Sequence, residues 1–169
     1  LLYRLALDMG MAASYEDLCR IVLETLLEAT AAEVGAILSI PNRPAPTRTG
    51  RSSQPEPSIS GKSLRGVEME VTAHRHRDPS IQTYIRVSDY VSNEVLASRE
   101  AILAEDVERD RLLRNRESLS DLGATSLICA PVIFGDRVLG LIHLYCTDLH
   151  KPLGDDDLEF TVAVAKQLG

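Results

Sequence analysis

The chain has 169 residues, of which 44% are hydrophobic and 25% charged, and its net charge at pH 7 is -7. This composition fits one soluble globular domain with its own core, and no apolar run approaches the roughly 20 residues that a membrane-spanning helix needs. The acidic balance argues against direct binding to nucleic acid. Three widely spaced cysteines argue for a reducing compartment, so we expect a cytoplasmic domain outside the membrane.

The first residues predict two helices. In "LLYRLALDMG", Leu2, Leu5 and Met9 have helical spacing, and we interpret residues 1–13 as a linker or signalling helix. Because this segment begins in mid-helix and the closing "FTVAVAKQLG" stops in one, we expect a piece of a longer chain. Ser14 stands three residues before Asp17, a variant of the capping box that opens a helix running to about residue 32.

Three strands follow, with a long excursion between the first and the second. Residues 33–40 form an apolar strand, and residues 67–73 and 81–87 alternate between apolar and polar side chains, as half-exposed strands do. Residues 41–66 are rich in proline, serine and arginine and predict a mobile surface loop, because they cannot bury enough apolar surface.

A possible zinc site lies in the turn between the two alternating strands. His74, His76 and Asp78 could bind the metal, but the arginines beside the histidines oppose its charge and a fourth ligand is not evident. We therefore expect no metal site.

The next segment predicts a cover for the sheet. Ser88 is expected to cap a helix over residues 89–99. Residues 100–124 combine a small apolar patch with dense alternating charge, which indicates an irregular, partly helical flap with a solvated face.

Residues 125–148, "TSLICAPVIFGDRVLGLIHLYCTD", predict a hairpin around Gly135 and Asp136. Both strands are apolar on both faces, so we expect the sheet to be covered on both sides, by the terminal helices and by residues 88–122. Pairing outward from a two-residue loop places Cys129 opposite Ile142, so Cys129 and His143 should point to opposite faces and cannot form a catalytic dyad. The cysteines of the hairpin are then small core residues. A last helix is predicted from about Gly154.

The order of these elements resembles that of a GAF domain over residues 14–168. The segments "SREAILAEDVERD", "GATSLICAPVIFGDRVLGLIHLY" and "PLGDDDLEFTVAVAKQLG" carry the likeness, with Pro131 and Gly140 at motif positions of the family. The longer phrases "LLYRLALDMG" and "RNRESLSDLGATSLICAPV" are similar to GAF domains of bacterial regulators that place a forkhead-associated (FHA) domain upstream, some with a sigma-54 activator ATPase downstream.

The resemblance implies an α+β fold: a central antiparallel sheet of about six strands, terminal helices on one face, and short helices and a flap on the other. It implies a GAF-like domain over residues 14–169 that acts as a non-catalytic sensor in a bacterial signalling or transcription regulator. The terminal helices would pair into a homodimer, and FHA or output domains would be attached. A small molecule would bind under the flap, with candidate contacts at Asn93, Arg99, Asp106, Ser126, His143 and Tyr145.

The identity of any ligand stays open. Covalent-chromophore members carry a cysteine in the covering segment, which residues 88–122 lack, and the signature of cyclic-nucleotide binders cannot be placed. Haem could bind through His143, but a lone strand histidine is more often a hydrogen-bonded core residue. We expect none of these three cofactors. The alternative is a structural dimerisation module without a ligand; an enzyme would need a convergent nucleophile–base pair or metal set, which the sequence does not predict.

Overall fold

The computed structural model describes residues 2–41, 69–82 and 87–169. In chain order its elements are α1 (Leu2–Gly10), α2 (Tyr15–Ala29), β1 (Val34–Ser39), β2 (Glu70–His76), α3 (Asp89–Ser98), β3 (Ile102–Ala104), α4 (Glu117–Leu122), β4 (Ser126–Phe134), β5 (Arg137–Cys146) and α5 (Asp155–Leu168).

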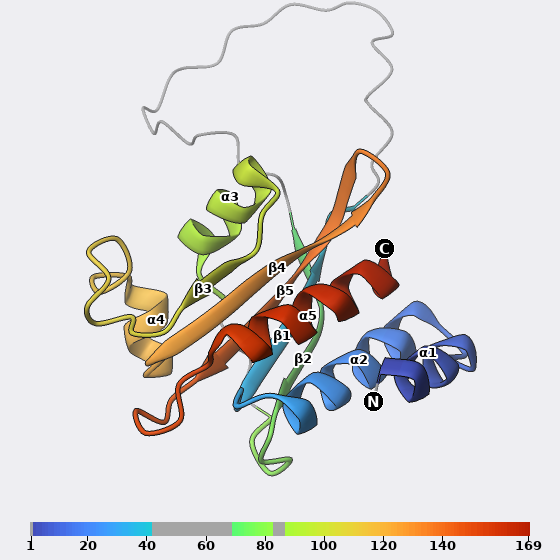
Figure 1. Cartoon of the computed structure of the whole chain (residues 1–169), viewed down its shortest axis with the longest axis horizontal. Coiled ribbons are helices and arrows are strands. Elements are labelled where there is room, and N and C mark those ends of the chain that lie inside the picture. Colours follow the sequence, from blue (N-terminus) through green and yellow to red (C-terminus); the bar gives the residue numbers. More distant parts are fainter. Residues whose placement is uncertain (1, 42–68, 83–86) are drawn as a thin grey trace, which may run out of the picture.

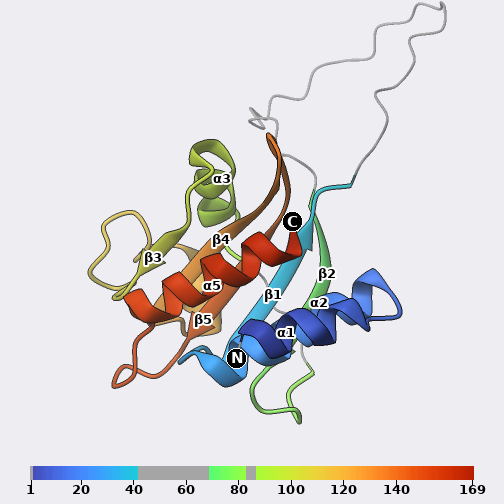
Figure 2. The same ribbon diagram turned by 45° about the vertical axis from the view of Figure 1, so that its right-hand side comes forward.

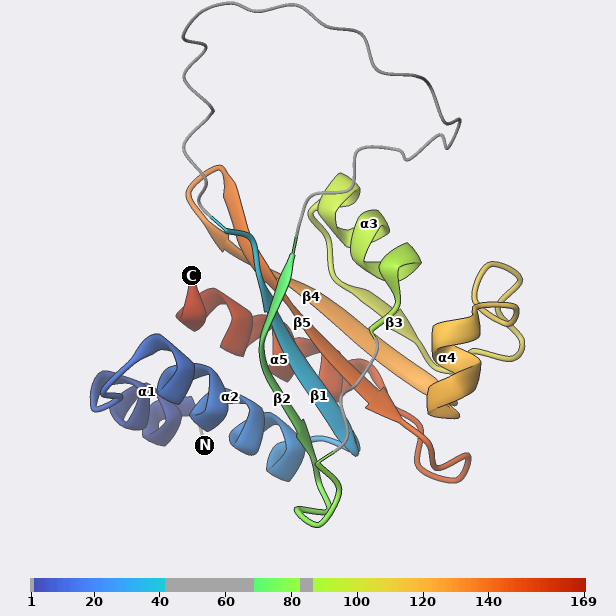
Figure 3. The same cartoon turned by 180° about the vertical axis from the view of Figure 1, so that it is seen from behind.

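The strands form one antiparallel sheet between two helical layers. Their order is β2-β1-β5-β4-β3. Helices α1, α2 and α5 cover one face (Figure 1), and α3 and α4 cover the other (Figure 3). Both termini lie in the layer of α1, α2 and α5 (Figure 2). The predicted α+β architecture is confirmed, with five strands among the described residues against about six predicted. Most of the strand predicted over 81–87 and most of the loop predicted over 41–66 lie outside those residues.

The sheet separates two apolar cores, because side chains on successive strand residues point to opposite faces. The helix-face core contains Leu5 and Leu26 from the helices together with Ile128, Ile142 and Leu144 from the sheet. The flap-face core contains Val91 and Val95 of α3, Val107 and Leu119 of the flap, and Leu127, Cys129, Leu141 and Tyr145 of the sheet. The predicted cover of each face is therefore confirmed.

The predicted N-caps of α2 and α3 are present. The hydroxyl of Ser14 accepts a hydrogen bond from the backbone N–H of Asp17 at 3.1 Å, and that of Ser88 accepts from Val91 at 3.4 Å. The carboxylate of Asp17 in turn accepts from the N–H of Ala13 at 3.4 Å. The carboxylate therefore bonds to the residue before the N-cap and not to the N-cap itself, while the Ser14 hydroxyl satisfies an N–H group that the first turn leaves without a helical partner.

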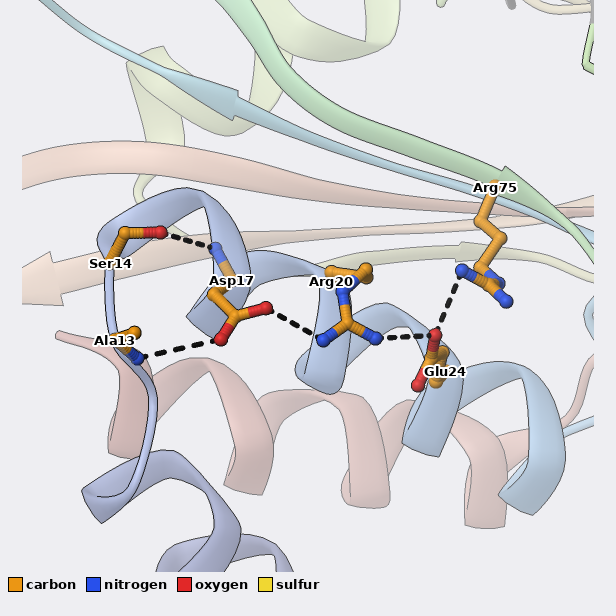
Figure 4. A network of polar contacts seen from close by, with 6 residues as sticks. All are labelled: Ala13, Ser14, Asp17, Arg20, Glu24 and Arg75. Carbon is orange, nitrogen blue, oxygen red and sulfur yellow. Dashed lines mark hydrogen bonds and ion pairs between the residues drawn. The ribbon is translucent and has the colours of Figure 1, made fainter.

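An ion-pair network connects α2 with strand β2 (Figure 4). The Arg20 guanidinium lies 2.6 Å from Asp17 and 3.0 Å from Glu24, and Glu24 is also 2.8 Å from Arg75 of β2. The hydrogen bond from Arg20 lowers the pKa of the Asp17 carboxyl. Because these side chains are about one-third to one-half exposed, the network aligns helix and strand more than it stabilises them.

A second contact holds the other end of α2. One nitrogen of the Arg77 guanidinium donates to the carbonyl oxygens of Leu27 and Thr30, each at 2.6 Å. A cation at this position satisfies carbonyls that the last helical turn leaves open and complements the negative end of the helix dipole.

The predicted register of the β4–β5 hairpin is wrong beyond its first two pairs. Ile133 pairs with Val138 as predicted, but the next pair is Val132 with Gly140, so Leu139 is an extra residue on β5. This β-bulge shifts every later pair by one position. As a result Cys129 pairs with His143 instead of Ile142, and the two side chains share the flap face.

Candidate functional site

Two of the six predicted contact residues meet at the centre of the flap face. His143 and Tyr145 lie on β5 with no exposed surface. Their side chains are hydrogen-bonded, with 2.8 Å between Nδ1 of His143 and the hydroxyl of Tyr145.

The other four lie elsewhere. Asn93 is exposed on α3, and Arg99 is exposed as the left-handed C-cap of the same helix. Asp106 is 44% exposed at its side chain and pairs with Arg109 at 3.2 Å. Ser126 is buried toward the helix side of the sheet, where its hydroxyl accepts from the N–H of Leu153 at 2.9 Å. The structure therefore does not bring these four residues together with His143.

Helix α3 supplies the remaining members of the cluster. The hydroxyl of Ser92 lies 3.0 Å from Nε2 of His143 and also 3.0 Å from the carbonyl oxygen of Ser88. The backbone N–H of Ser88 donates to the Tyr145 hydroxyl at 3.1 Å. We call Ser88, Ser92, Cys129, His143 and Tyr145 the His143 network; it joins the first turns of α3 to the central strands β4 and β5.

The proton positions in the network follow from its partners. The Ser92 hydroxyl donates its one proton to the carbonyl of Ser88, so it can only accept from Nε2 of His143. Nδ1 then carries no proton and accepts from the Tyr145 hydroxyl, whose oxygen accepts from the N–H of Ser88. Each N–H and O–H donor of the network thus has an acceptor, and the arrangement requires a neutral imidazole.

Burial reinforces this protonation state. Desolvation lowers the pKa of His143 to about 3, and it raises the pKa of the Cys129 thiol and of the Tyr145 phenol. In the closed domain all three groups are therefore uncharged near neutral pH. The prediction that His143 is a hydrogen-bonded core residue is confirmed, since both ring nitrogens have partners.

Cys129 and His143 are as close as a catalytic nucleophile and its base, but the cysteine lacks the properties of a nucleophile. The sulfur lies 3.3 Å from Nε2, so the prediction that the two are out of reach is wrong. A nucleophilic cysteine needs a lowered thiol pKa and access to substrate. Here the thiol pKa is raised and both side chains have no exposed surface, so the pair is a packed core contact.

Outside the network, a cation–aromatic contact connects the two helices of the flap face. The guanidinium carbon of Arg116, at the N-cap of α4, lies 3.8 Å from the centre of the Tyr90 ring on α3. A cation over an aromatic face is attracted to the ring electrons. This contact joins α3 and α4.

Sequence reasoning missed Ser88, Ser92 and Cys129 as members of the site. Cys129 was missed because the β-bulge reverses the face on which it was predicted to lie relative to His143. Ser92 carried a usable signal, because it lies beside Val91 and before Val95, so a polar side chain on the buried side of α3 must find a partner in the sheet.

Other features of the described residues do not converge on the network. A groove of about 470 Å³ lies between α1 and α2, and one of about 400 Å³ lies between α2 and β2. Within the described ranges, no three His, Cys, Asp or Glu side chains are grouped so that they could hold a metal ion. No helix in the same part of the chain has the length and apolarity to cross a membrane.

A sheet covered by terminal helices on one face and by a flap on the other defines an α+β domain with a separate core on each face. The family model for the GAF domain matches residues 14–169, and the chain belongs to this family. GAF domains are regulatory sensor modules of signalling proteins and are in general not catalytic. Among curated proteins, none matches the chain.

Solved structures share the fold at low sequence identity. The GAF domain of a phosphoenolpyruvate-protein phosphotransferase from Coxiella burnetii is 15% identical, with 99% of this chain and 87% of that chain covered and a TM-score of 0.66. A methyl-accepting chemotaxis protein fragment is 13% identical, with 97% and 92% covered and a TM-score of 0.67. The GAF domain of the cyanobacteriochrome TePixJ is 10% identical, with 95% and 89% covered and a TM-score of 0.65. These likenesses show the fold alone.

Proposed function

We propose that this domain is the sensor module of a bacterial signalling or transcription regulator, with the flap face as its input side and the terminal helices as its output side. The main support comes from the hydrogen-bond partners of the buried polar groups on the two faces of the sheet. On the helix face, Thr30 and Thr161 bond to carbonyls of their own helices, and Ser126 of β4 accepts from the N–H of Leu153, just before α5. On the flap face, Ser92 and the backbone of Ser88 bond to side chains of β5. Bonds between elements can be exchanged for bonds to a ligand.

A small molecule that binds under the flap would meet His143 and Tyr145 after α3 has moved away. The signal would then pass through β5, because His143 faces the flap while its neighbours Ile142 and Leu144 belong to the helix-face core. Such a ligand must favour one arrangement of the helices over another, since equal affinity for both would transmit nothing.

The second candidate is a structural module without a ligand. The observation in its favour is the packing of the flap face, where Leu127, Leu141 and Tyr145 are fully buried. Because these side chains already fill the space beneath α3, a ligand could bind there only after the flap opens.

Native mass spectrometry of the freshly purified domain, followed by the same measurement under denaturing conditions, separates the two candidates. A sensor should carry a co-purified small molecule that denaturation releases and that Tyr145→Phe retains less well. A domain that stays free of ligand, and whose thermal stability no member of a metabolite library raises, would contradict the sensor and favour the structural module.

We further propose a homodimer through the terminal helices. Tyr3, Leu7 and Met11 support it, because these apolar side chains are 79%, 53% and 84% exposed and recur every four residues along and just beyond α1. Leu7→Glu should convert a dimer to a monomer in light scattering. The control is Leu112→Glu, at another exposed leucine (61%) in the flap. A dimer that survives Leu7→Glu would place the interface elsewhere.

The host is proposed to be a multidomain cytoplasmic regulator that carries an FHA domain, an output domain or both. The support is the similarity of "LLYRLALDMG" and "RNRESLSDLGATSLICAPV" to the GAF domains of such regulators. Sequencing the gene on both sides of this segment tests the proposal directly, and flanking domains of another kind would contradict it.

A further inference from the structure

Helix α3 is attached to the sheet by apolar packing and by hydrogen bonds to two neighbouring side chains of β5. Within the described residues, α3 packs on the flap-face core through Val91 and Val95. Its buried hydrogen bonds to the sheet side chains all run to His143 and Tyr145. The Tyr90–Arg116 contact joins α3 to α4 and not to the sheet.

We propose that the His143 network is a proton-sensitive latch that keeps α3 closed on the sheet and releases it when His143 takes up a second proton. This deepens the proposed function, on which it rests only in taking the flap face as the input side. The reason is geometric: each N–H and O–H proton of the network is already directed to an acceptor.

A second proton on His143 would have to sit on Nδ1. That atom accepts the hydroxyl proton of Tyr145. The Tyr145 hydroxyl would then have to turn away and lose its acceptor, while its oxygen received protons from both the imidazole and the N–H of Ser88. A buried donor without an acceptor is costly, so protonation and the closed position of α3 exclude each other.

Among the described residues, the side chains that face His143 carry no charge. In register with it, β1 presents Ala36 and β4 presents Cys129. Tyr145 follows on β5 and Ser92 faces it from α3. Cys129 and Tyr145 are the titratable groups among these, and burial raises the pKa of each, so both are neutral. The carboxylate of Asp89, exposed in the first turn of α3, also acts on Tyr145 and raises its pKa, after the larger effect of burial.

The latch has a definite pH response. His143 has a pKa of about 3 when the flap is closed. When the flap opens, water reaches the ring, and the pKa returns to about 6.5. The opening constant should therefore rise about 30-fold between pH 7.5 and pH 5, because the open state binds a proton that the closed state excludes. The sign is fixed: closure is favoured above the open-state pKa and weakens as the pH falls through it.

Hydrogen exchange of the domain, followed by mass spectrometry at both pH values and corrected for intrinsic exchange rates, tests the latch. Amides of α3 should lose about 30-fold in protection at pH 5, while amides of α5, on the opposite face, serve as the reference. Ser92→Ala should lower α3 protection at least tenfold at pH 7.5, because Nε2 loses its oxygen acceptor. Ser120→Ala, at an exposed serine of α4, is the matched control.

His143→Gln removes the titrating group and should leave α3 protection independent of pH. If α3 opens only together with the whole sheet, or if its pH response persists in His143→Gln, the latch is wrong. If that variant does not fold, the latch is still tested by Ser92→Ala and by the pH response of the parent domain. A failed latch leaves the sensor proposal intact, because ligand retention tests that proposal separately.

Discussion

Gly140 of β5 offers the sharpest test of how the sheet is packed. It pairs with Ser39 of β1 on one side and with Val132 of β4 on the other. A Cβ atom built on Gly140 overlaps the carbonyl oxygen of Leu38 and lies 3.3 Å from its carbonyl carbon. Both neighbours are backbone atoms, which cannot move aside as a flexible side chain would.

Gly140→Ala must therefore push β1 away from β5. Overpacking of a core costs roughly 1–3 kcal/mol, and each ladder hydrogen bond that is lost adds about 1 kcal/mol. We expect the free energy of unfolding to fall by about 2–4 kcal/mol, which in a domain of this size lowers the melting temperature by about 5–15 °C.

Chemical denaturation followed by circular dichroism measures this loss. The control is Gly10→Ala at the end of α1, where an added Cβ meets no atom within 4 Å. The same change of side chain should there be neutral or stabilise the domain by roughly 0.5–1 kcal/mol. Equal stability of the two variants would refute the close approach of β1 and β5 at Gly140.

Three further predictions concern α2. Ser14→Ala removes the N-cap and should cost about 1 kcal/mol in chemical denaturation; an unchanged midpoint would contradict the capping role of Ser14. Arg77→Gln removes a charged donor from two carbonyls at the end of α2 and should cost about 1–2 kcal/mol, with no loss expected if water replaces the guanidinium. A double-mutant cycle on Glu24 and Arg75 should give a coupling below about 1 kcal/mol that fades in high salt; a larger, salt-independent value would contradict the exposed character of this pair.

The fold could be predicted because its signals are local and redundant. Strands that are apolar on both faces require two covers, and the terminal helices and residues 88–122 were the candidates with suitable patterns. The caps at Ser14 and Ser88 followed from residue type and position alone. These inferences hold whatever the register of the strands.

The site could not be predicted to the same degree, because it depends on register. Strand side chains alternate with a period of two, so one extra residue exchanges the faces of every residue beyond it on that strand. Nothing in the stretch around Leu139 marks it as the extra residue, and Cys129 was therefore assigned to the wrong face. Asn93 lies on the side of α3 away from Val91 and Val95, and Arg99 is the C-cap of that helix, so both side chains are exposed.

The bulge and the glycine beside it belong to one local arrangement that builds the flap face. The carbonyl of Leu139 accepts the N–H of Ile40 at 2.9 Å, which ties the extra residue to the end of β1. Gly140 follows at once and lets the β1 backbone approach. Without the extra residue, Ile128 would take the place of Cys129 opposite His143. The chemistry of the flap face therefore depends on a backbone irregularity several residues away, and a substitution at Gly140 should disturb α3 protection as well as stability.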